Sequence, residues 1–220
     1  GGEGFPKKHL KDLWKIKNKG LINVYGPSEC TCICSKHKVM KKDIFFEKEK
    51  FVSLGKITDN FTYKIDKTNQ ELLLFGEGVG QGYLNNKKLT QKNFIYKKNK
   101  ILGYKTGDIV KVINKKIYFI GRVDNQVKVM GYRVELEEIE KQMINIKYVK
   151  ECVVIFKSSN NELISYVHSQ NKISSNKIIE ELNKILPYYM IPKTINILRK
   201  PLKKNRNYKI DRKYYNLINV

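Results

Sequence analysis

Short apolar runs separated by polar turns dominate the first part of the chain. Apolar residues recur at helical spacing in the segment 6–17, which predicts a helix, and Gly20 follows as its end. The run LINVYG then has the length and composition of a buried strand. Two hairpins are predicted further along, formed by 61–66 with 71–75 and by 109–113 with 117–120. As far as residue 120, the pattern therefore predicts a strand-rich region.

The pattern changes at Gly121. GRVDNQVKVMGYRV is polar and typical of short strands. ELEEIEKQM then predicts a helix with glutamates near its N-terminal end, where the helix dipole favours negative charge. Further strands are predicted at 151–156, 163–167 and 194–198, and a helix capped by Asn176 is predicted to run to about Leu186. The roughly 95 residues after Asp124 are enough to fold alone. We therefore divide the chain into a first domain, 1–124, and a second domain, 125–220.

Three cysteines alternate in the segment CTCIC. Alternation predicts a strand that carries Cys30, Cys32 and Cys34 on one face. A zinc site is the alternative because His37 follows closely, but no CxxC pair completes a ligand set. We favour small apolar side chains lining a strand. Free thiols, together with a start that does not read as a signal peptide, predict a reducing, cytoplasmic location.

The charge of the chain raises the question of a polyanionic partner. The formal net charge is +23, from 44 basic and 21 acidic residues. Only five of the basic residues are arginines, however, and arginine is the usual reader of phosphates and bases. Lysine, asparagine and isoleucine are heavily used together, as A/T-rich codons favour. No run of 18 apolar residues occurs, so no membrane span is predicted. We expect neither nucleic acid nor a membrane as a partner.

Six motifs occur in a fixed order, and their order is more specific than any one of them. They are NVYGPSE at 23–29, ELLLFGEGVGQGYLNNKKLT at 71–90, YKTGD at 104–108, GRVDNQVKVMGYRVELEEIE at 121–140, LPYYMIP at 186–192 and NYKIDRK at 207–213. The series resembles the adenylation domains of nonribosomal peptide synthetases and the D-alanine–carrier protein ligases. Both belong to the adenylate-forming superfamily of acyl-CoA synthetases and luciferases. The resemblance covers essentially the whole chain.

The resemblance implies an α/β fold. The chain would hold the end of a large, strand-rich AMP-binding domain with a small barrel-like part, followed by a small α+β lid domain. It implies a ligase that forms an aminoacyl adenylate and pyrophosphate from ATP. The aminoacyl group would then pass to the phosphopantetheine thiol of a carrier protein acting in trans, with Mg²⁺ as the metal. The motif LPYYMIP favours carrier loading over an acyl-CoA or fatty-acid ligase of the same superfamily.

By this resemblance, one set of residues would bind the nucleotide. Those around the adenine would be Gly1, Gly2, Glu3, Asn23, Val24, Tyr25 and Gly26, with Tyr25 stacked on the ring and the amide of Asn23 at the exocyclic amine. Ser28 would bond the phosphate, and Glu29 would hold Mg²⁺, a hard cation suited to carboxylate oxygens. Asp108 would accept both ribose hydroxyls, and Arg122 would donate to the ribose.

A second set of residues would serve the lid. Lys209 would be the catalytic cation near the reacting carboxylate, and Asp124 would be the hinge. In the thioester-forming state, Lys128 and Gly131 would lie beside the path of the pantetheine arm. The family usually has glycine where this chain has Tyr208 and Gln70, immediately before Lys209 and Glu71. A side chain at Tyr208 restricts the backbone of the loop that carries the lysine.

The sequence predicts the class of the substrate side chain, not the individual amino acid. By the resemblance, the side-chain pocket includes Gly1, Val24, Cys32 and Ile33, which predict a small or medium uncharged amino acid. The family's phosphate loop, and the acidic residue that holds the substrate ammonium, would precede Gly1 and are not in this sequence. We therefore expect the 220-residue chain to be inactive by itself. A non-catalytic or regulatory protein that keeps the lid fold is the alternative.

Overall fold

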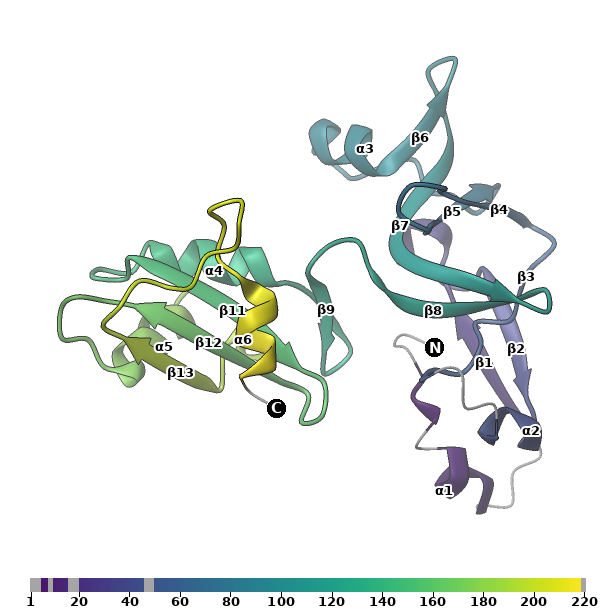
Figure 1. The fold of residues 1–220 in the computed structure, drawn as a ribbon. Coiled ribbons are helices and arrows are strands. Elements are labelled where there is room, and N and C mark those ends of the chain that lie inside the picture. Colours follow the sequence, from purple (N-terminus) through teal and green to yellow (C-terminus); the bar gives the residue numbers. More distant parts are fainter. Residues whose placement is uncertain (1–4, 8–9, 16–19, 46–49, 219–220) are drawn as a thin grey trace. The chain divides into compact units, whose positions relative to one another are not determined.

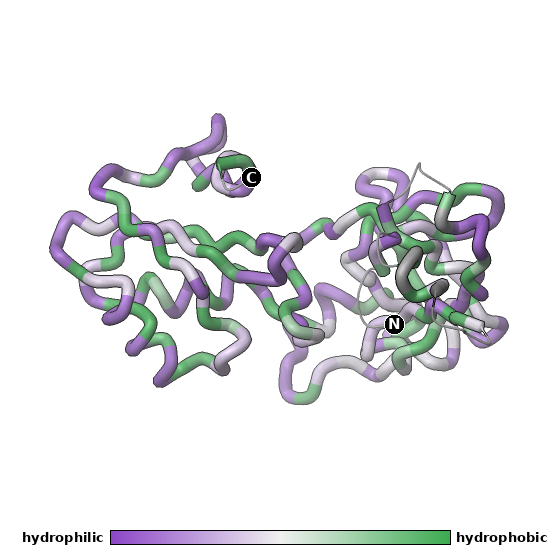
Figure 2. The backbone as a smooth tube through the Cα atoms, turned by 90° about the horizontal axis from the view of Figure 1, so that it is seen from below, coloured by the Kyte–Doolittle hydropathy of each residue, from purple (hydrophilic) through white to green (hydrophobic). Residues whose placement is uncertain are grey.

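The computed structural model describes residues 5–7, 10–15, 20–45 and 50–218. The chain divides into two compact units, Gly1–Asp124 and Asn125–Val220 (Figure 1). The division falls after Asp124, the residue at which the sequence pattern predicted the domain boundary. Hydrophobic stretches alternate with hydrophilic connections along the tube in Figure 2. The buried residues form clusters that each lie within one unit.

The first unit is rich in strands. Its smaller sheet is antiparallel with the order β1-β2-β3, from Leu21–Tyr25, Ser35–Val39 and Lys56–Ile57. The larger sheet has the order β4-β5-β7-β6 with β8 also paired to β7, from Phe61–Ile65, Glu71–Gly76, Lys100–Ile113, Phe94–Lys97 and Lys116–Arg122. The short helices are α1 (Leu10–Lys15), η2 (Ser28–Cys30), α2 (Lys41–Ile44) and α3 (Lys87–Asn93).

The strand β7 organises the larger sheet. It pairs with β6 along its first part, with β8 along its second part, and with β5 across both. The core inside this sheet contains Leu72, Leu74, Phe94, Tyr104 and Val110. The two hairpins predicted from the sequence are present as β4–β5 and β7–β8, and both are antiparallel.

The second unit is a small α+β domain. Its elements are β9 (Gln126–Val129), β10 (Tyr132–Glu135), α4 (Leu136–Ile144), β11 (Glu151–Lys157), β12 (Glu162–His168), α5 (Ser175–Asn183), η3 (Tyr188–Met190), β13 (Thr194–Leu198) and α6 (Arg212–Leu217). The strands β9 and β10 form a hairpin, and the sheet β11-β12-β13 is mixed, with β13 parallel to β12.

Both faces of this sheet are buried. Along β11, Cys152 and Val154 enter one core, and Val153 and Ile155 enter the other. The first core is closed by apolar residues of α4 and α5, and the second by Leu202 and side chains of α6. Since successive side chains of a strand point to opposite faces, a sheet buried on both sides requires continuous apolar runs. The sequences ECVVIF and LISYV meet that requirement.

Two sequence predictions were wrong. The segment CTCIC is no strand, because Cys30 ends η2, Thr31 and Cys32 have left-handed backbone angles, and β2 begins only at Ser35. The cap of α5 is Ser174, whose hydroxyl accepts the amide of Lys177. The predicted cap, Asn176, lies inside the helix, which ends at Asn183.

The predicted α/β architecture is confirmed, although several elements of the first unit were not predicted. They are α2, α3, β2, β3, β6 and the first half of β7, and α6 of the second unit was also missed. The predicted helix 6–17 is present as α1, Leu10–Lys15, but its predicted start is wrong, because Pro6 forms an isolated antiparallel bridge with Phe51. Within the part of the chain that the structure describes, no helix is long and apolar enough to cross a membrane.

Candidate nucleotide-binding site

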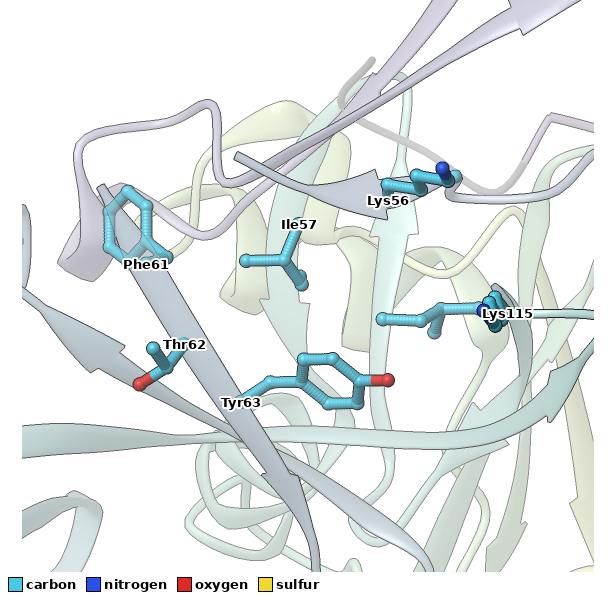
Figure 3. Close-up of a pocket in the computed structure, with 8 residues that line it drawn as sticks. Lys56, Ile57, Phe61, Thr62, Tyr63 and Lys115 are labelled. Carbon is cyan, nitrogen blue, oxygen red and sulfur yellow. The ribbon is translucent and has the colours of Figure 1, made fainter. Parts of the chain in front are cut away.

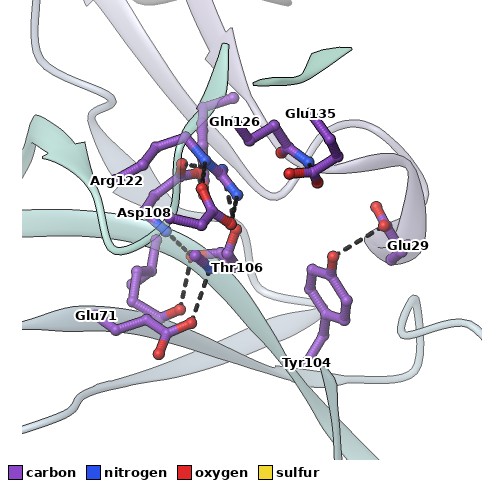
Figure 4. A network of polar contacts seen from close by, with 12 residues as sticks. Glu29, Glu71, Tyr104, Thr106, Asp108, Arg122, Gln126 and Glu135 are labelled. Atoms are coloured by element: carbon purple, nitrogen blue, oxygen red, sulfur yellow. Dashed lines mark hydrogen bonds and ion pairs between the residues drawn. The ribbon is translucent and has the colours of Figure 1, made fainter. Parts of the chain in front are cut away.

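Asp108 lies at the centre of a polar cluster in the first unit (Figure 4). The hydroxyl of Tyr25, at the end of β1, donates to its Oδ2 at 2.6 Å. Nη1 of Arg122, at the end of β8, donates to its Oδ1 at 2.6 Å. The carboxylate is buried, and β1, β7 and β8 each contribute one member of the cluster. The fold thus brings together three residues that are far apart in the sequence.

The backbone that presents Asp108 is fixed by its neighbours. Gly107 has φ +74°, and its amide donates to Oε1 of Glu71 at 2.8 Å. The hydroxyl of Thr106 donates to the carbonyl of Leu72 at 2.8 Å and accepts the amide of Asp108 at 3.0 Å. A charge-assisted bond and two neutral bonds therefore hold the backbone of β7 before Asp108 in one conformation, where the pairing of β7 with β5 shifts register.

Arg122 joins Asp108 to Asp124. Its Nε and Nη2 donate to the two carboxylate oxygens of Asp124 at 2.7 and 2.8 Å, in bidentate geometry. Its Nη1 also donates to the carbonyl of Thr106 at 3.2 Å. One guanidinium thus links the expected ribose ligand, Asp108, to the expected hinge residue.

Tyr25 acts as a hydrogen-bond donor in this cluster. Burial and the neighbouring Asp108 carboxylate raise the pKa of Tyr25 well above its ordinary value. The phenol therefore keeps its proton at neutral pH, and the carboxylate keeps a donor on Oδ2.

Glu29 is held by two tyrosines. The hydroxyls of Tyr83 and Tyr104 both donate to its Oε1, at 2.6 and 2.8 Å. Burial and the Glu29 carboxylate raise the pKa of Tyr83, so this donor also stays protonated. Among the described residues there is no group of three or more histidine, cysteine, aspartate or glutamate side chains placed to hold a metal. One oriented carboxylate fits Mg²⁺, which typically binds one or two protein carboxylates together with phosphate oxygens and water.

The remaining residues of the NVYGPSE segment and its continuation lie around this cluster. Asn23 is buried, and its amide donates to the carbonyl of Ser53 at 2.9 Å. A Cβ on Gly26 would lie 2.7 Å from the carbonyl oxygen of Cys32, so only glycine fits there. The amide of Cys34 donates to the carbonyl of Tyr25 at 2.7 Å. The turn after η2 therefore folds back onto the end of β1.

The expected pocket residues differ in exposure. Val24 is partly buried in β1, whereas Cys32 and Ile33 are exposed on the returning turn. Ser28 is exposed at the start of η2. Gly1, Gly2 and Glu3 lie outside the described residues.

The expected lid residues occupy two loops or turns of the second unit. Lys209 is exposed in the connection between β13 and α6. Lys128 is exposed on β9, and Gly131 lies in the turn between β9 and β10 with φ +84°. A Cβ built on Gly131 meets no atom within 4 Å.

Two hollows of the described residues are lined by other residues. One hollow of the first unit has a volume of about 470 Å³ and is drawn in Figure 3. Its lining residues are Gly55, Lys56, Ile57, Phe61, Thr62, Tyr63, Lys115 and Ile117. A hollow of the second unit, of about 780 Å³, lies between α4 and α5. Neither is lined by an expected site residue, and the polar cluster therefore defines the candidate site.

The supporting residues of the site were not assigned roles from the sequence. Glu71, Thr106 and Gly107 fix the backbone that presents Asp108, and Tyr83 and Tyr104 orient Glu29. All five lie inside the motifs ELLLFGEGVGQGYLNNKKLT and YKTGD. The motifs therefore contained these residues, but only the folded structure shows which of them contact one another.

Comparison with known proteins finds peptide synthetases among the relatives of the chain. No family model matches it. It is 38% identical over 215 residues to gramicidin S synthase 2 of Brevibacillus brevis, an alignment that covers 89% of this chain and 5% of that protein. The chain thus spans a small part of the length of the curated relatives it matches.

Solved structures show the same fold. The Vibrio cholerae adenylation domain AlmE, in complex with glycyl-adenosine-5'-phosphate, matches with a TM-score of 0.83 and 23% identity over 100% of this chain and 44% of that chain. An NRPS protein containing adenylation and PCP domains matches with a TM-score of 0.79 and 24% identity over 97% of this chain and 39% of that chain. At these identities the likeness concerns the fold alone.

Proposed function

Because this chain belongs to the adenylate-forming superfamily and corresponds to the C-terminal part of an amino-acid adenylation domain, we propose that it serves an amino-acid-activating ligase. The ligase consumes ATP, forms an aminoacyl adenylate and pyrophosphate, and passes the aminoacyl group to the phosphopantetheine thiol of a carrier protein. Relatives that are peptide synthetases, and a neighbour that contains adenylation and PCP domains, support the carrier as the acceptor.

The geometry of Asp108 carries the proposal. A carboxylate has about four lone-pair positions. The hydroxyl of Tyr25 and the guanidinium of Arg122 use one on each oxygen, at 2.6 Å in both cases. These bonds orient both oxygens, and we assign the carboxylate to the two hydroxyls of a ribose, since an ionised carboxylate can accept hydrogen bonds from two donors. In this role Tyr25 and Arg122 orient the carboxylate, and Tyr25 offers its ring to the adenine.

Glu29 supplies the proposed metal ligand. The two tyrosine hydroxyls fix its orientation, and a hard carboxylate oxygen suits Mg²⁺. A bound Mg²⁺ would neutralise charge on the phosphates. Ser28, next in the chain and exposed, would donate its hydroxyl to a phosphate oxygen.

The second unit supplies the proposed lid. Lys209 would bring a positive charge to the carboxylate and the bridging oxygens while the adenylate forms. Gly131, with no side chain, and Lys128 would lie beside the pantetheine arm in the second half-reaction. Asp124 would be the hinge about which the unit rotates between the state in which Lys209 acts and the state in which Gly131 lies beside the pantetheine arm. Val24, Cys32 and Ile33 are uncharged, and we propose a small or medium uncharged side chain for the substrate.

Amino-acid-dependent exchange between ATP and pyrophosphate tests the proposal on the longest natural form of the protein. Exchange is expected with an uncharged amino acid, and Asp108→Asn should lower it at least tenfold, since a bond to a charged group contributes about 1.5–3 kcal/mol. Exchange driven by a fatty acid would favour the acyl-CoA type of ligase. No exchange with any acid would favour a non-catalytic protein and contradict the proposal.

The two half-reactions test the lid. Lys209→Ala should slow adenylate formation on the order of 10²–10³-fold while leaving transfer from supplied aminoacyl adenylate nearly intact. Gly131→Leu should do the reverse, because a side chain there would block the pantetheine arm. If each variant slows both steps equally, the lid does not alternate in this way.

A further inference from the structure

The connection that carries Lys209 is attached to the second unit at both of its ends. It leaves β13 after Leu198 and returns at α6, and it is drawn in yellow in Figure 1. The segment is strongly basic, with the residues Arg199, Lys200, Lys203, Lys204, Arg206 and Lys209. Like charges in a short loop repel one another, so a defined conformation needs opposite charges nearby.

The downstream attachment is an arginine–glutamate pair. Arg212, three residues after Lys209, donates from Nη1 and Nη2 to the two carboxylate oxygens of Glu140 on α4, at 2.7 and 3.0 Å. Both side chains are largely buried, with 19% and 17% of their areas exposed. Nη1 of Arg212 also donates to the carbonyl of Val154, and Oε1 of Glu140 accepts the amide of Val154 at 2.7 Å. The start of α6 is thereby fixed to both α4 and β11.

The upstream attachment is Glu151, the first residue of β11. Its Oε2 accepts the amide of Leu202 at 2.7 Å, and its Oε1 pairs with Nζ of Lys204 at 2.9 Å. Leu202 is itself buried in the second core. The chain is therefore fixed on the N-terminal side of Lys209 as well.

The chain between the two attachments folds back on itself. The amide of Asn205 donates to the carbonyl of Lys209 at 2.7 Å, and the amide of Asp211 donates to the carbonyl of Lys203 at 2.8 Å. Oδ1 of Asn205 accepts the amides of Asn207 and Lys209, at 2.9 and 3.2 Å. These bonds give the backbone of Lys209 a defined position relative to α4 and β11 while its side chain stays exposed.

We propose that Arg212 and Glu140 are positioning residues that hold Lys209 for adenylate formation. The inference rests on the proposed function, because it assigns the pair to the step in which Lys209 acts. A displacement of about 1 Å at a catalytic group can cost on the order of 100-fold in rate. The bidentate geometry explains an arginine at 212, since a lysine cannot make two parallel bonds to one carboxylate.

The half-reactions of the longest natural form test the pair. Arg212→Lys and Glu140→Gln should each slow adenylate formation about 10- to 100-fold, and transfer from supplied aminoacyl adenylate should stay within about twofold of the unchanged protein. Glu162→Gln is the matched control, because Glu162 pairs with the exposed Lys193 on another edge of the unit and should leave both steps unchanged. Equal loss in both half-reactions would overturn the proposal.

A double-variant cycle separates positioning from general loss of structure. If Arg212 acts only through Lys209, then Arg212→Lys should cause no further loss of adenylate formation in a Lys209→Ala background. Multiplicative losses would show that Arg212 acts independently of Lys209 and would contradict the inference.

Hydrogen exchange distinguishes a failure of this inference from a failure of the proposed function. In the 220-residue chain, Arg212→Lys should speed exchange at the amides of Asn205 and Asp211, whether or not the protein activates an amino acid. If the protein shows no adenylation but this exchange rises, the function fails and the attachment stands. Unchanged exchange at both amides would overturn the attachment itself.

Discussion

At two positions the family that this chain resembles usually has glycine, whereas this chain has another residue with left-handed backbone angles. Tyr208 has φ +58° and Gln70 has φ +61°. Glycine adopts this region without the clash that a Cβ causes, whereas other L-residues bear a cost. The structure therefore gives a physical reason for the glycines of the family. In this chain the amide of Tyr208 donates to the carbonyl of Asn205, and the amide of Lys209 donates to Oδ1 of Asn205. These bonds hold the turn in spite of the strain.

Substitution at Tyr208 measures that strain. The side chain is 88% exposed, so its removal costs little packing. We expect Tyr208→Gly to be more stable than Tyr208→Ala by about 1 kcal/mol, because only the alanine keeps a Cβ in the left-handed region. Urea unfolding of the two variants measures the difference. A glycine variant that is less stable than the alanine variant would contradict the backbone assignment.

Gly107 is the glycine on which the Asp108 cluster depends. Its φ is +74°, and a Cβ there would lie 2.4 Å from Nη2 of Arg122. Gly107→Ala should therefore displace the guanidinium from Asp108 and Asp124, and nucleotide affinity should fall about tenfold or more, since a bond to a charged group contributes about 1.5–3 kcal/mol. Titration calorimetry with ATP on the longest natural form checks this. Gly121→Ala is the control, because a Cβ there meets no atom within 4 Å, and an equal loss in both variants would contradict the argument.

At the scale of elements, strongly patterned segments were predicted and context-dependent ones were not. The continuous apolar run of β11 has few alternatives to a buried strand. By contrast, the alternation in CTCIC suggested a strand, but hydrogen bonds from the amides of Cys30 and Cys32 to the carbonyl of Pro27 form a turn instead. Such local backbone bonds leave no periodic signal in the sequence. The short strands β3 and β6 are similarly determined by their pairing partners.

The start of α5 allows a direct test of a corrected prediction. The hydroxyl of Ser174 accepts the amide of Lys177 at 3.2 Å, whereas Asn176 is the second residue of the helix. Ser174→Ala should destabilise the chain by about 1 kcal/mol, as is typical for loss of an N-cap. Asn176→Ala should be neutral or stabilising, since alanine has the higher helix propensity. Thermal unfolding of both variants decides between the two caps.

The attachment of the 199–211 connection to β11 should depend on pH. Burial raises the pKa of Glu151, but hydrogen bonds from Lys204 and the Leu202 amide, with the charges of Lys204 and His168, lower it overall. Because the folded pKa lies below the unfolded one, the stabilisation is complete above the ordinary glutamate value of about 4.3 and is lost as the pH falls through the folded pKa.

The free energy of unfolding, measured against pH for the unchanged chain and for Glu151→Gln, checks this dependence. The gap between the two should be widest near neutral pH and should close in acid. Glu138→Gln, at an exposed position of α4, is the control and should give no such gap. A constant gap across the pH range would show that the charge of Glu151 is not what holds the connection.

At the scale of the whole molecule, the ordered motifs identified the site residues more successfully than any single pattern. Tyr25, Asp108 and Arg122 lie about 14 to 97 positions apart in the sequence and meet in one cluster. A motif could name them but could not show that Asp124 shares the same guanidinium, or that Tyr83 and Tyr104 orient Glu29. The contacts of Glu29 join η2 to β7 and to the segment between β5 and α3, and no local pattern encodes that arrangement.

The second unit, residues 125–220, has the composition of an independently folding domain. Both cores of the second unit are built from residues of this segment alone, and α4, α5 and α6 cover the two faces of its sheet. A sheet covered on both sides needs no further partner to bury its apolar surface, and a segment of this size can fold by itself. We therefore expect residues 125–220, expressed alone, to unfold in one cooperative urea transition.

A core substitution makes that expectation quantitative. Ile139 is fully buried in the first core, so Ile139→Ala should lower the free energy of unfolding by about 2–5 kcal/mol. The loss should be equal, within about 0.5 kcal/mol, in the isolated segment and in the corresponding transition of the 220-residue chain, because the residues of that core all belong to the second unit. A gradual, non-cooperative loss of structure in the segment, or a much smaller effect of Ile139→Ala there than in the whole chain, would mean that the second unit depends on the first for its fold.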